Sequence, residues 1–540
     1  AVTPTLPEAI SFTPPKPVIG LPELPNLPSP PSFNIQLGSY CNSMTGCGSM
    51  GTNGGPYNST YQSYAVSISG GTVSGTLTDG RPSLRYSWSD SRRGSMNPSV
   101  LLKSYFDLQG TYTLSTSLTI SSINPVANDN TLSTDNRQVF LVGGSRIATL
   151  DNAPAGSTLT NATTINLEGP LTVGFEAQTD NLGSGSKHNT TADNRSLVNS
   201  GTITDKEEKN DNWIKNMPYD TSGAGAGKYL TIKGPTEDYY IKRSTDGYVG
   251  YKVALALIQE DTVHGGTIIN DTTGVIDFRG ERSIGLYTYL PNPSSANVYS
   301  NRPMTNKGSI LLSGAESYGM KYAATEVAGA VDFVNDQNAN ITLRKNPNGS
   351  DKADTATAMA LMRDNSVTTK VTLTRGKAVN KGNINLEDNI SNALGMFVNI
   401  DSNMINEGTI KVSAVAPKVS DKYQFNVAMR ADQADLTYEG ASAGNTEVIN
   451  KKDIKLTGQG AMGMIASGTS TSGANTKHAI ATNNAGATIN IDKEGTATSK
   501  DNFGMLATNQ AEVVKTVNVK NPLQDVSNIV DRNLKKVDSS

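Results

Sequence analysis

The sequence contains few of the residues on which metal sites and common catalytic centres depend. Among its 540 residues there are three histidines, two cysteines and two tryptophans. His188, His264 and His478 have no second His or Cys at a spacing that suits a zinc ligand set. Neither a Gly-x-Ser-x-Gly element nor a Gly-Asp-Ser-Gly stretch occurs. We therefore expect no catalytic residues, no metal site, no cofactor and no enzymatic activity.

Excess charge and long apolar runs are also missing. Charged residues make up 18% of the chain and the formal net charge is −3, so there is no basic surplus to bind a phosphate backbone. Nucleic acid is therefore not an expected partner. No apolar run approaches the roughly 20 residues needed to span a bilayer, and the chain does not start with a charged-then-apolar leader. If the protein is exported, we expect this to be a mature form.

The first residues are rich in proline, whereas the remainder favours glycine and small polar residues. Residues 1–31 hold many of the 24 prolines, which favours an extended segment that either docks as a strap or remains a disordered leader. Cys41 and Cys47 lie in "YCNSMTGCG" and could close a local disulfide, as we expect of an exported chain, or remain reduced in a cytosolic one. The 51 glycines suit a chain that turns often between short strands.

A turn-and-strand phrase returns along most of the chain, as in "AVNKGNINL", "MINEGTIKV" and "VINKKDIKL". It recurs at intervals of about 36 residues in the second half, the period of a solenoid repeat. We expect the asparagine before each turn to stack on its equivalents above and below. These residues are Asn161, Asn199, Asn270, Asn306, Asn335, Asn380, Asn406, Asn450 and Asn484.

Each turn is followed by two apolar residues with one residue between them, which is mostly polar. Because strand side chains alternate between faces, both apolar residues point inward and the residue between them points outward. Ile203 starts the same pattern, which Asp205 interrupts. The pairs are Ile165/Leu167, Ile276/Phe278, Ile310/Leu312, Ile341/Leu343, Ile384/Leu386, Ile410/Val412, Ile454/Leu456 and Ile489/Ile491.

A second element follows each pair, for example "SIGLYTY", "ALGMFVN" and "AMGMIAS". Its small residue followed by Leu or Met suits a bend in which a flexible side chain fills the core. Single units cannot bury their apolar faces, but stacked copies can. We predict an all-β, right-handed parallel β-helix with an N-terminal Pro-rich strap and a small Cys-containing β subdomain. A β-sandwich array is the alternative, but the regularly spaced two-residue hairpin turns that it needs are scarce.

The predicted organisation has four parts. Residues 1–31 form the Pro-rich extended segment, 32–160 the N-terminal β subdomain with the first rungs, 161–521 the β-helix, and 522–540 a tail or truncated continuation. Insertions interrupt the β-helix at about 178–230 and 287–303. The first insertion contains the charged segment "DKEEKNDN" at 205–212. This segment lacks the ligand spacing of a calcium loop and is therefore predicted to be a solvated loop.

Aromatic residues gather in and just beyond these insertions, and we select them as candidate ligand-binding residues. Loops on a rigid scaffold commonly carry binding residues, and Tyr and Trp stack on sugars or on protein partners. Alternatively, these side chains cover the rungs beneath the loops. The candidates are Trp213, Tyr219, Tyr229, Tyr239, Tyr240, Tyr287, Tyr289 and Tyr299.

The opening "VTPTLPEAISFTPPKPVIGLPELPNLPSPPSFNIQ" resembles the N-terminal segment of the large type V autotransporter adhesins of fusobacteria, and "VNKGNINL … ALGMFV" resembles the rungs of their passengers. The resemblance implies a monomeric passenger on the bacterial surface, held at the outer membrane by a C-terminal β-barrel outside this sequence. It also implies virulence-related attachment to a host-cell receptor or glycan, or coaggregation with other bacteria. The alternatives are a carbohydrate-active β-helix enzyme and an inert spacer of a longer surface protein.

Overall fold

The computed structural model describes the chain in segments, and every structural statement below refers to them. They are residues 67–68, 71–73, 84–86, 102–108, 112–114, 118–121, 131–132, 145–149, 156–169, 172–179, 195–208, 230–233, 238–259, 266–289, 303–323, 332–362, 377–400, 402–433, 445–468, 479–491, 501–508, 512–517 and 529–531. These residues form strands and turns without a helix, so none of them provides an apolar helix that could cross a membrane. Cys41, Cys47 and the Pro-rich segment lie outside them.

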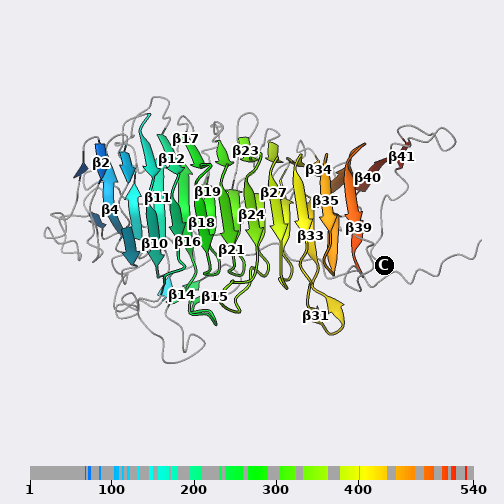
Figure 1. Ribbon diagram of the computed structural model, residues 1–540, viewed down its shortest axis with the longest axis horizontal. Coiled ribbons are helices and arrows are strands. Elements are labelled where there is room, and N and C mark those ends of the chain that lie inside the picture. Colours follow the sequence, from blue (N-terminus) through cyan, green and yellow to red (C-terminus); the bar gives the residue numbers. More distant parts are fainter. Residues whose placement is uncertain are drawn as a thin grey trace, which may run out of the picture.

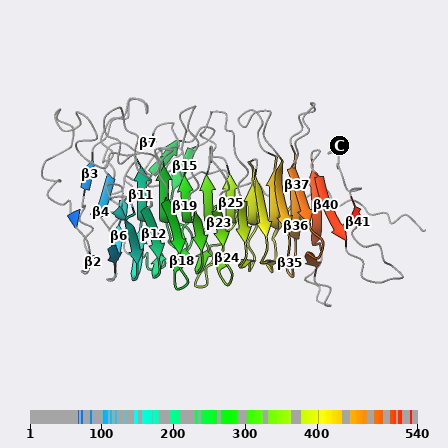
Figure 2. The same ribbon diagram turned by 90° about the horizontal axis from the view of Figure 1, so that it is seen from above.

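Three long sheets run side by side along the molecule, which is a right-handed parallel β-helix as predicted (Figures 1 and 2). Sheet A contains β1 (Ser67–Ile68), β3 (Leu84–Tyr86), β4 (Leu102–Leu108), β8 (Ser145–Thr149), β11 (Thr172–Thr179), β16 (Lys252–Gln259), β19 (Ile284–Tyr289), β22 (Tyr318–Ala323), β25 (Thr357–Met362), β28 (Leu394–Val398), β33 (Asn426–Asp432), β36 (Ala461–Ser467) and β39 (Phe503–Thr508). Within it, only β3 runs antiparallel to its neighbour.

Sheet B contains β2 (Gly71–Val73), β5 (Tyr112–Leu114), β9 (Thr158–Asn161), β12 (Arg195–Asn199), β17 (Gly266–Asn270), β20 (Met304–Asn306), β23 (Asp332–Asn335), β26 (Lys377–Asn380), β29 (Asn403–Asn406), β34 (Thr446–Asn450), β37 (Ala479–Asn483), β40 (Glu512–Val517) and β41 (Ile529–Asp531). Sheet C contains β6 (Leu118–Ser121), β10 (Thr164–Glu168), β13 (Thr202–Thr204), β18 (Val275–Phe278), β21 (Ser309–Leu312), β24 (Asn340–Leu343), β27 (Asn383–Leu386), β30 (Thr409–Val412), β35 (Asp453–Leu456) and β38 (Thr488–Ile491).

Two small sheets lie outside these three. One joins β7 (Thr131–Leu132), β14 (Leu230–Lys233) and β15 (Asp238–Ile241). The other is the hairpin of β31 (Lys418–Val419) and β32 (Lys422–Tyr423). From β9 onward a complete rung follows the order sheet B, sheet C, sheet A, so that each strand pairs with its equivalent one rung away.

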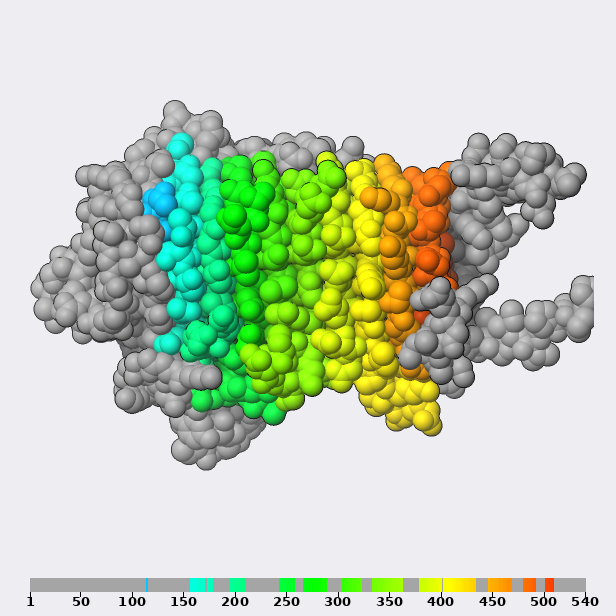
Figure 3. Space-filling view, viewed as in Figure 1, coloured from blue at the N-terminus to red at the C-terminus, as the bar shows by residue number. Residues whose placement is uncertain are grey.

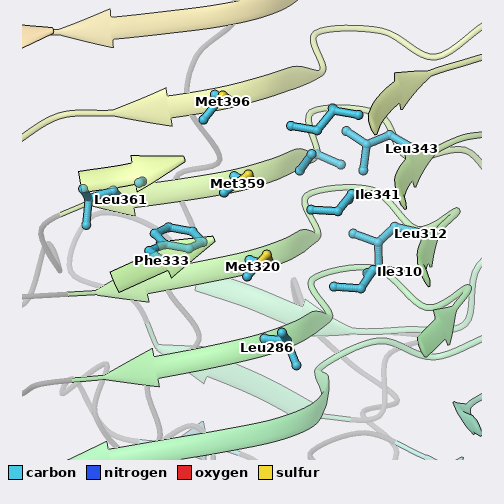
Figure 4. Packing of buried hydrophobic residues seen from close by; sticks show 14 of the residues in the cluster. Leu286, Ile310, Leu312, Met320, Phe333, Ile341, Leu343, Met359, Leu361 and Met396 are labelled. Atoms are coloured by element: carbon cyan, nitrogen blue, oxygen red, sulfur yellow. The ribbon is translucent and has the colours of Figure 1, made fainter. Parts of the chain in front are cut away.

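The apolar pairs share one interior, as predicted. Ile310 pairs with Ile276 and Ile341, and Leu312 pairs with Phe278 and Leu343. The pairs from Ile165/Leu167 to Ile454/Leu456 are fully buried, whereas Ile489 and Ile491 are partly buried. Opposite them, sheet A supplies the column Leu286, Met320, Met359, Met396, Met429, Met464 and Met505 (Figure 4).

The second element of the repeat carries a small residue next to a core residue, and the predicted bend there stays a prediction. Ala358 and Met359 are consecutive in β25, yet both belong to the core cluster, so the strand does not alternate strictly between core and surface at this point. In the equivalent position of β19, a Cβ on Gly285 would lie 2.5 Å from the carbonyl oxygen of Gly319. The small residue therefore lets adjacent rungs approach closely.

The asparagine ladder is confirmed, with one correction. The Nδ2 of each asparagine donates to the Oδ1 of the next, with distances of 2.7 to 2.9 Å from Asn161 to Asn483. The last member is Asn483, so the prediction of Asn484 was wrong by one residue. Asn484 instead begins a turn closed by the amide of Ala487, which lengthens this connection between sheets B and C.

Candidate functional site

Long connections leave the solenoid at two corners. Sheet B passes to sheet C through short turns, as between Asn380 and Asn383. From sheet A to the next sheet B strand the chain often uses longer stretches, such as residues 290–303 after β19 and 363–376 after β25. Residues 205–251, 344–356 and 413–425 are long connections from sheet C to sheet A. Because the rungs are in register, the connections of each kind begin at the same corner of successive rungs.

The structure describes only some of the predicted ligand-binding aromatics. Trp213, Tyr219, Tyr229 and Tyr299 lie outside the described residues, as do the three histidines. Tyr239 and Tyr240 are consecutive on β15. Tyr289 is the last residue of β19.

Tyr287 does not fit its predicted role, because its side chain is fully buried. It lies on β19 beside Lys321 of β22, whose Nζ is 5.7 Å from the centre of the Tyr287 ring and 4.6 Å from that of Tyr318. The ring thus packs against an ammonium group. The prediction that Tyr287 binds a ligand was wrong, because it placed Tyr287 at the start of an insertion, whereas the residue lies within β19 and is buried.

The outward column to which Tyr287 belongs is buried from β11 to β36, whereas its next member, Leu506 of β39, is partly exposed. In register along sheet A, the buried members are Glu176, Ala256, Tyr287, Lys321, Ala360, Phe397, Arg430 and Ile465. All are fully buried except Arg430, which is 5% exposed. Arg430 pairs with Asp432 two residues along the same strand, with Nε 2.7 Å from Oδ1. Sheet A is therefore covered on both faces.

Sheet C has a more open outward face. Lys411 and Lys455 point outward on paired strands and both are exposed. Asp277, the acidic residue that the sequence places on this face, is only 9% exposed and lies 3.9 Å from Arg279. Burial raises the pKa of the Asp277 carboxyl, while the nearby Arg279 opposes the shift. An ion pair therefore occupies this part of the face.

The charged segment that starts at residue 205 is not simply a solvated loop. Asp205 and Glu208 are buried, as is Lys252 of β16, whose Nζ lies 3.3 Å from Asp205 Oδ2 and 2.6 Å from Glu208 Oε2. Asp205 Oδ1 and Oδ2 also accept the backbone amides of Arg279 and Gly280 at 2.7 and 2.8 Å. The prediction of a solvated loop was wrong for these two acids, because their partners are distant in the sequence and lie on the same rung or on the rungs next to it.

The buried ion cluster of Asp205, Glu208 and Lys252 joins the end of sheet C to the start of a sheet A strand. Burial raises the pKa of Glu208 to about 7; attraction to Lys252 lowers it, and Asp205 raises it further. Glu208 also accepts the backbone amides of Gly169 and Val249. This arrangement ties neighbouring rungs together, and the described residues contain no group of three or more His, Cys, Asp or Glu side chains that could hold a metal ion.

An ordered projection that the sequence did not predict lies between β30 and β33, the hairpin of residues 417–424. In some rungs sheet C passes to sheet A through a compact turn, as at 387–393, whereas here β31 and β32 extend the connection. The available signal was the long interval between Val412 and Asn426. Val415 and Val419, beside and within the hairpin, are the exposed large hydrophobic residues of the described chain.

A comparison with protein families finds one match. Residues 109–437 match the model described as "BigA third pectate lyase-like domain", which spans more than half of the chain, from the β5 rung to just beyond β33. No curated protein and no solved structure matches the chain significantly. The family match supports a β-helix domain of a bacterial surface protein. The chain, with its three registered parallel sheets, belongs to the BigA third pectate lyase-like domain family.

Proposed function

We propose that this chain is the adhesive rod of a bacterial surface protein and that it binds its partners without chemical turnover. The observation that carries the proposal is the family match to a pectate lyase-like domain across a continuous β-helix. Stacked rungs form a stiff body, and its long connections can present binding residues along its length.

The partners proposed are a host-cell receptor or glycan, or the surface of another bacterium. The resemblance of the repeats to autotransporter passengers supports a monomeric passenger held at the outer membrane. In this arrangement the rod holds its binding surfaces away from the cell. The proposed binding segments remain the connections after β11, after β13 and after β19. Tyr287 is not included because it is buried.

Binding of the purified chain to receptor arrays, glycan arrays and intact cells tests the proposal. Two variants shorten the insertions, by deleting residues 209–229 or 290–302. The first deletion begins after Glu208, because removing Asp205 and Glu208 would leave Lys252 buried without its carboxylates. We expect the intact chain to bind and the deletions to weaken binding.

A chain that binds no receptor, glycan or cell would contradict adhesion and favour the inert spacer. If the intact chain binds and both deletion variants bind equally well, adhesion stands but the two segments are not its site. Thermal unfolding of each variant should show the cooperative transition of the parent, which separates a lost contact from a lost fold.

A carbohydrate-active enzyme is the second candidate, favoured by the pectate lyase-like family and by Asp277, whose pKa is raised by burial although Arg279 lies nearby and lowers it. A carboxyl with a raised pKa can act as a general acid or base. Release of reducing ends from anionic and neutral polysaccharides tests this function. Release by the parent that is lost in Asp277→Asn would favour catalysis over binding alone.

A further inference from the structure

The hairpin of residues 417–424 projects from the regular outline of the rod. In Figure 1 it extends below the rungs at the label β31, and in Figure 3 the same segment stands out in yellow. Its strands are antiparallel, with Lys418 opposite Tyr423 and Val419 opposite Lys422. The amide of Gln424 donates to the carbonyl of Pro417 at 2.9 Å, which closes the hairpin at its base.

Aromatic contacts fix the hairpin to the rod. The Tyr423 ring lies 5.7 Å from the Phe425 ring, which in turn lies 5.5 Å from the Phe503 ring of β39, both in edge-to-face arrangements. Gln459 donates its side-chain amide to the Tyr423 hydroxyl. Gly460 lies beneath this ring, where an added Cβ would come within 2.8 Å of Tyr423 Cδ1. The hairpin is therefore held in place before any partner binds, which reduces the entropy cost of binding.

Ser420 and Asp421 form the tip in an unusual backbone conformation. Their φ angles are 49° and 64°, the left-handed region required at both central residues of a type I′ turn. Asn-Gly is the favoured sequence for this turn, and non-glycine residues at positive φ carry a conformational cost. The hairpin adopts this turn despite the cost, and the flanking Lys418, Val419 and Lys422 are exposed to solvent.

Exposed side chains at the tip combine one apolar group with two cations. Val419 is 61% exposed, and Lys418 and Lys422 beside it are exposed as well. On the outer face of sheet C, Lys411 of β30 lies within electrostatic reach of Glu387, so its charge is partly balanced there. At the tip itself, Lys418 and Lys422 against Asp421 leave one net positive charge.

We propose that the hairpin is a docking element for an acidic protein surface, with Val419 entering a small apolar pocket between carboxylates that pair with Lys418 and Lys422. The proposal rests on the adhesive function proposed above and names a separate surface for it. A rigid apolar anchor flanked by charges is a typical way for a protein to bind another protein with defined orientation.

Other polyanionic partners fit the tip less well. Sugars are commonly held by exposed aromatic rings, but Tyr423 is only 9% exposed and packs against Phe425. A single exposed Val419 provides too little apolar area for stable insertion into a membrane. Asp421 lies between the two lysines, so the tip offers no continuous row of cations along which a phosphate or sulfate backbone could lie.

The test measures binding of the intact chain and of four variants to cultured epithelial cells. Val419→Asp and the double variant Lys418→Glu/Lys422→Glu alter the tip, and Val419→Ile preserves its chemistry. Lys451→Glu/Lys452→Glu is the matched control, because it makes the same charge change at exposed residues of the turn between sheets B and C. Each variant should unfold at the same temperature as the parent, because the substituted residues are exposed and their replacement should not affect the fold.

We expect the two tip-altering variants to bind at least tenfold more weakly, and Val419→Ile and the matched control to remain within twofold of the parent. Binding should fall after trypsin treatment of the cells and persist after sialidase and heparinase treatment. Added salt should weaken the parent more than Lys418→Glu/Lys422→Glu, because that variant lacks the attractive charges.

Equal binding of the parent and both tip-altering variants overturns the hairpin proposal and leaves adhesion intact. Loss after sialidase or heparinase treatment, with survival of trypsin treatment, identifies a glycan and overturns a protein partner. If the chain binds phosphatidylserine vesicles, if the tip-altering variants weaken this binding, and if trypsin treatment of cells has no effect, the partner is a lipid surface and the proposal of a protein partner is overturned. Absence of binding by the parent overturns the adhesive function and this proposal together.

Discussion

Sheets A and C belong to the same rungs, yet their outward faces differ. Along sheet A, the outward Tyr287, Lys321 and Phe397 are fully buried. Along sheet C, the outward Lys411 and Lys455 are exposed, and Asn385 is partly exposed. On the later rungs, a side chain that points away from the solenoid core is therefore part of the folded interior in sheet A and is at least partly solvated in sheet C, whereas Asp277 and Thr342 on earlier rungs of sheet C are buried.

This difference has a counterpart in the sequence. Sheet C strands such as "NINL" alternate polar and apolar residues, the pattern of a strand with one solvated face. Sheet A strands such as "TAMALM" and "LGMFV" show no alternation, the pattern of a strand covered on both faces. The absence of alternation thus carried information about burial, and not only about a bend with a flexible side chain.

The largest effect is expected from removing a large outward side chain of sheet A. Phe397→Ala should lower the free energy of unfolding by about 3–5 kcal/mol, because it deletes a fully buried ring. Lys411→Ala on sheet C is the control and should change it by no more than about 0.5 kcal/mol. Urea unfolding followed by circular dichroism measures both. Similar small effects for the two variants would contradict the difference between the faces.

The asparagine ladder provides a second comparison between inward and outward positions. Asn335→Ala should cost about 1–3 kcal/mol, because it removes the ladder partners of Asn306 and Asn380, each held at 2.8 Å. Asn385→Ala changes the same residue type on the outward face of sheet C and should be close to neutral. The same urea titration tests this, and an equal cost at both positions would mean that the ladder adds no stability.

Protonation of Glu208 should make stability depend on pH at the junction of the two sheets. Burial raises its pKa to about 7 in the folded protein from an ordinary value of 4.5, so the folded state holds the proton more tightly than the unfolded state. Its contribution to stability is complete below pH 4.5 and is lost as the pH rises through about 7. The resulting decrease is at most about 1.4 kcal/mol per pH unit.

Urea titrations of the parent and of Glu208→Gln between pH 4 and pH 8 give the free energy of unfolding at each pH. The contribution of Glu208 is the difference between the two slopes of this free energy against pH, in the window between its ordinary pKa of 4.5 and its folded pKa of about 7. We expect a shallower decline in the variant. Glu207→Gln is the matched control, because Glu207 is the exposed neighbour and its substitution should leave the slope unchanged. A parental slope in Glu208→Gln would assign the pH dependence to other groups.

The smallest effect is expected on the exposed face of sheet C. Lys455→Glu places a carboxylate opposite Lys411 on the next rung and should raise the free energy of unfolding by about 0.2–1 kcal/mol. Lys455→Gln separates the loss of repulsion from the gain of attraction. The gain should shrink at high salt, and a salt-independent gain would show that side-chain packing causes it.

Local spacing was sufficient to predict the repeat, the inward pairs and nearly all of the ladder. It misplaced the last ladder position because "ATNNAGATINI" offers two consecutive asparagines and a longer turn. The pairing of Asn483 with Asn450 across the rungs selects the first of them. The same dependence on distant neighbours explains why the partners of Glu208 were not found, since Lys252 lies 44 residues further along the chain.

The sequence by itself determined the periodic unit and the side chains that enter the core, because alternation and turn chemistry act over a few residues. Only the tertiary structure decided that Tyr287 is buried, that Glu208 is held next to Lys252, and that the hairpin with Val419 stands clear of the rod. Each of these depends on which rungs become neighbours and on what covers an outward face. Such contacts join positions far apart in the chain, and the spacing within one repeat does not encode them.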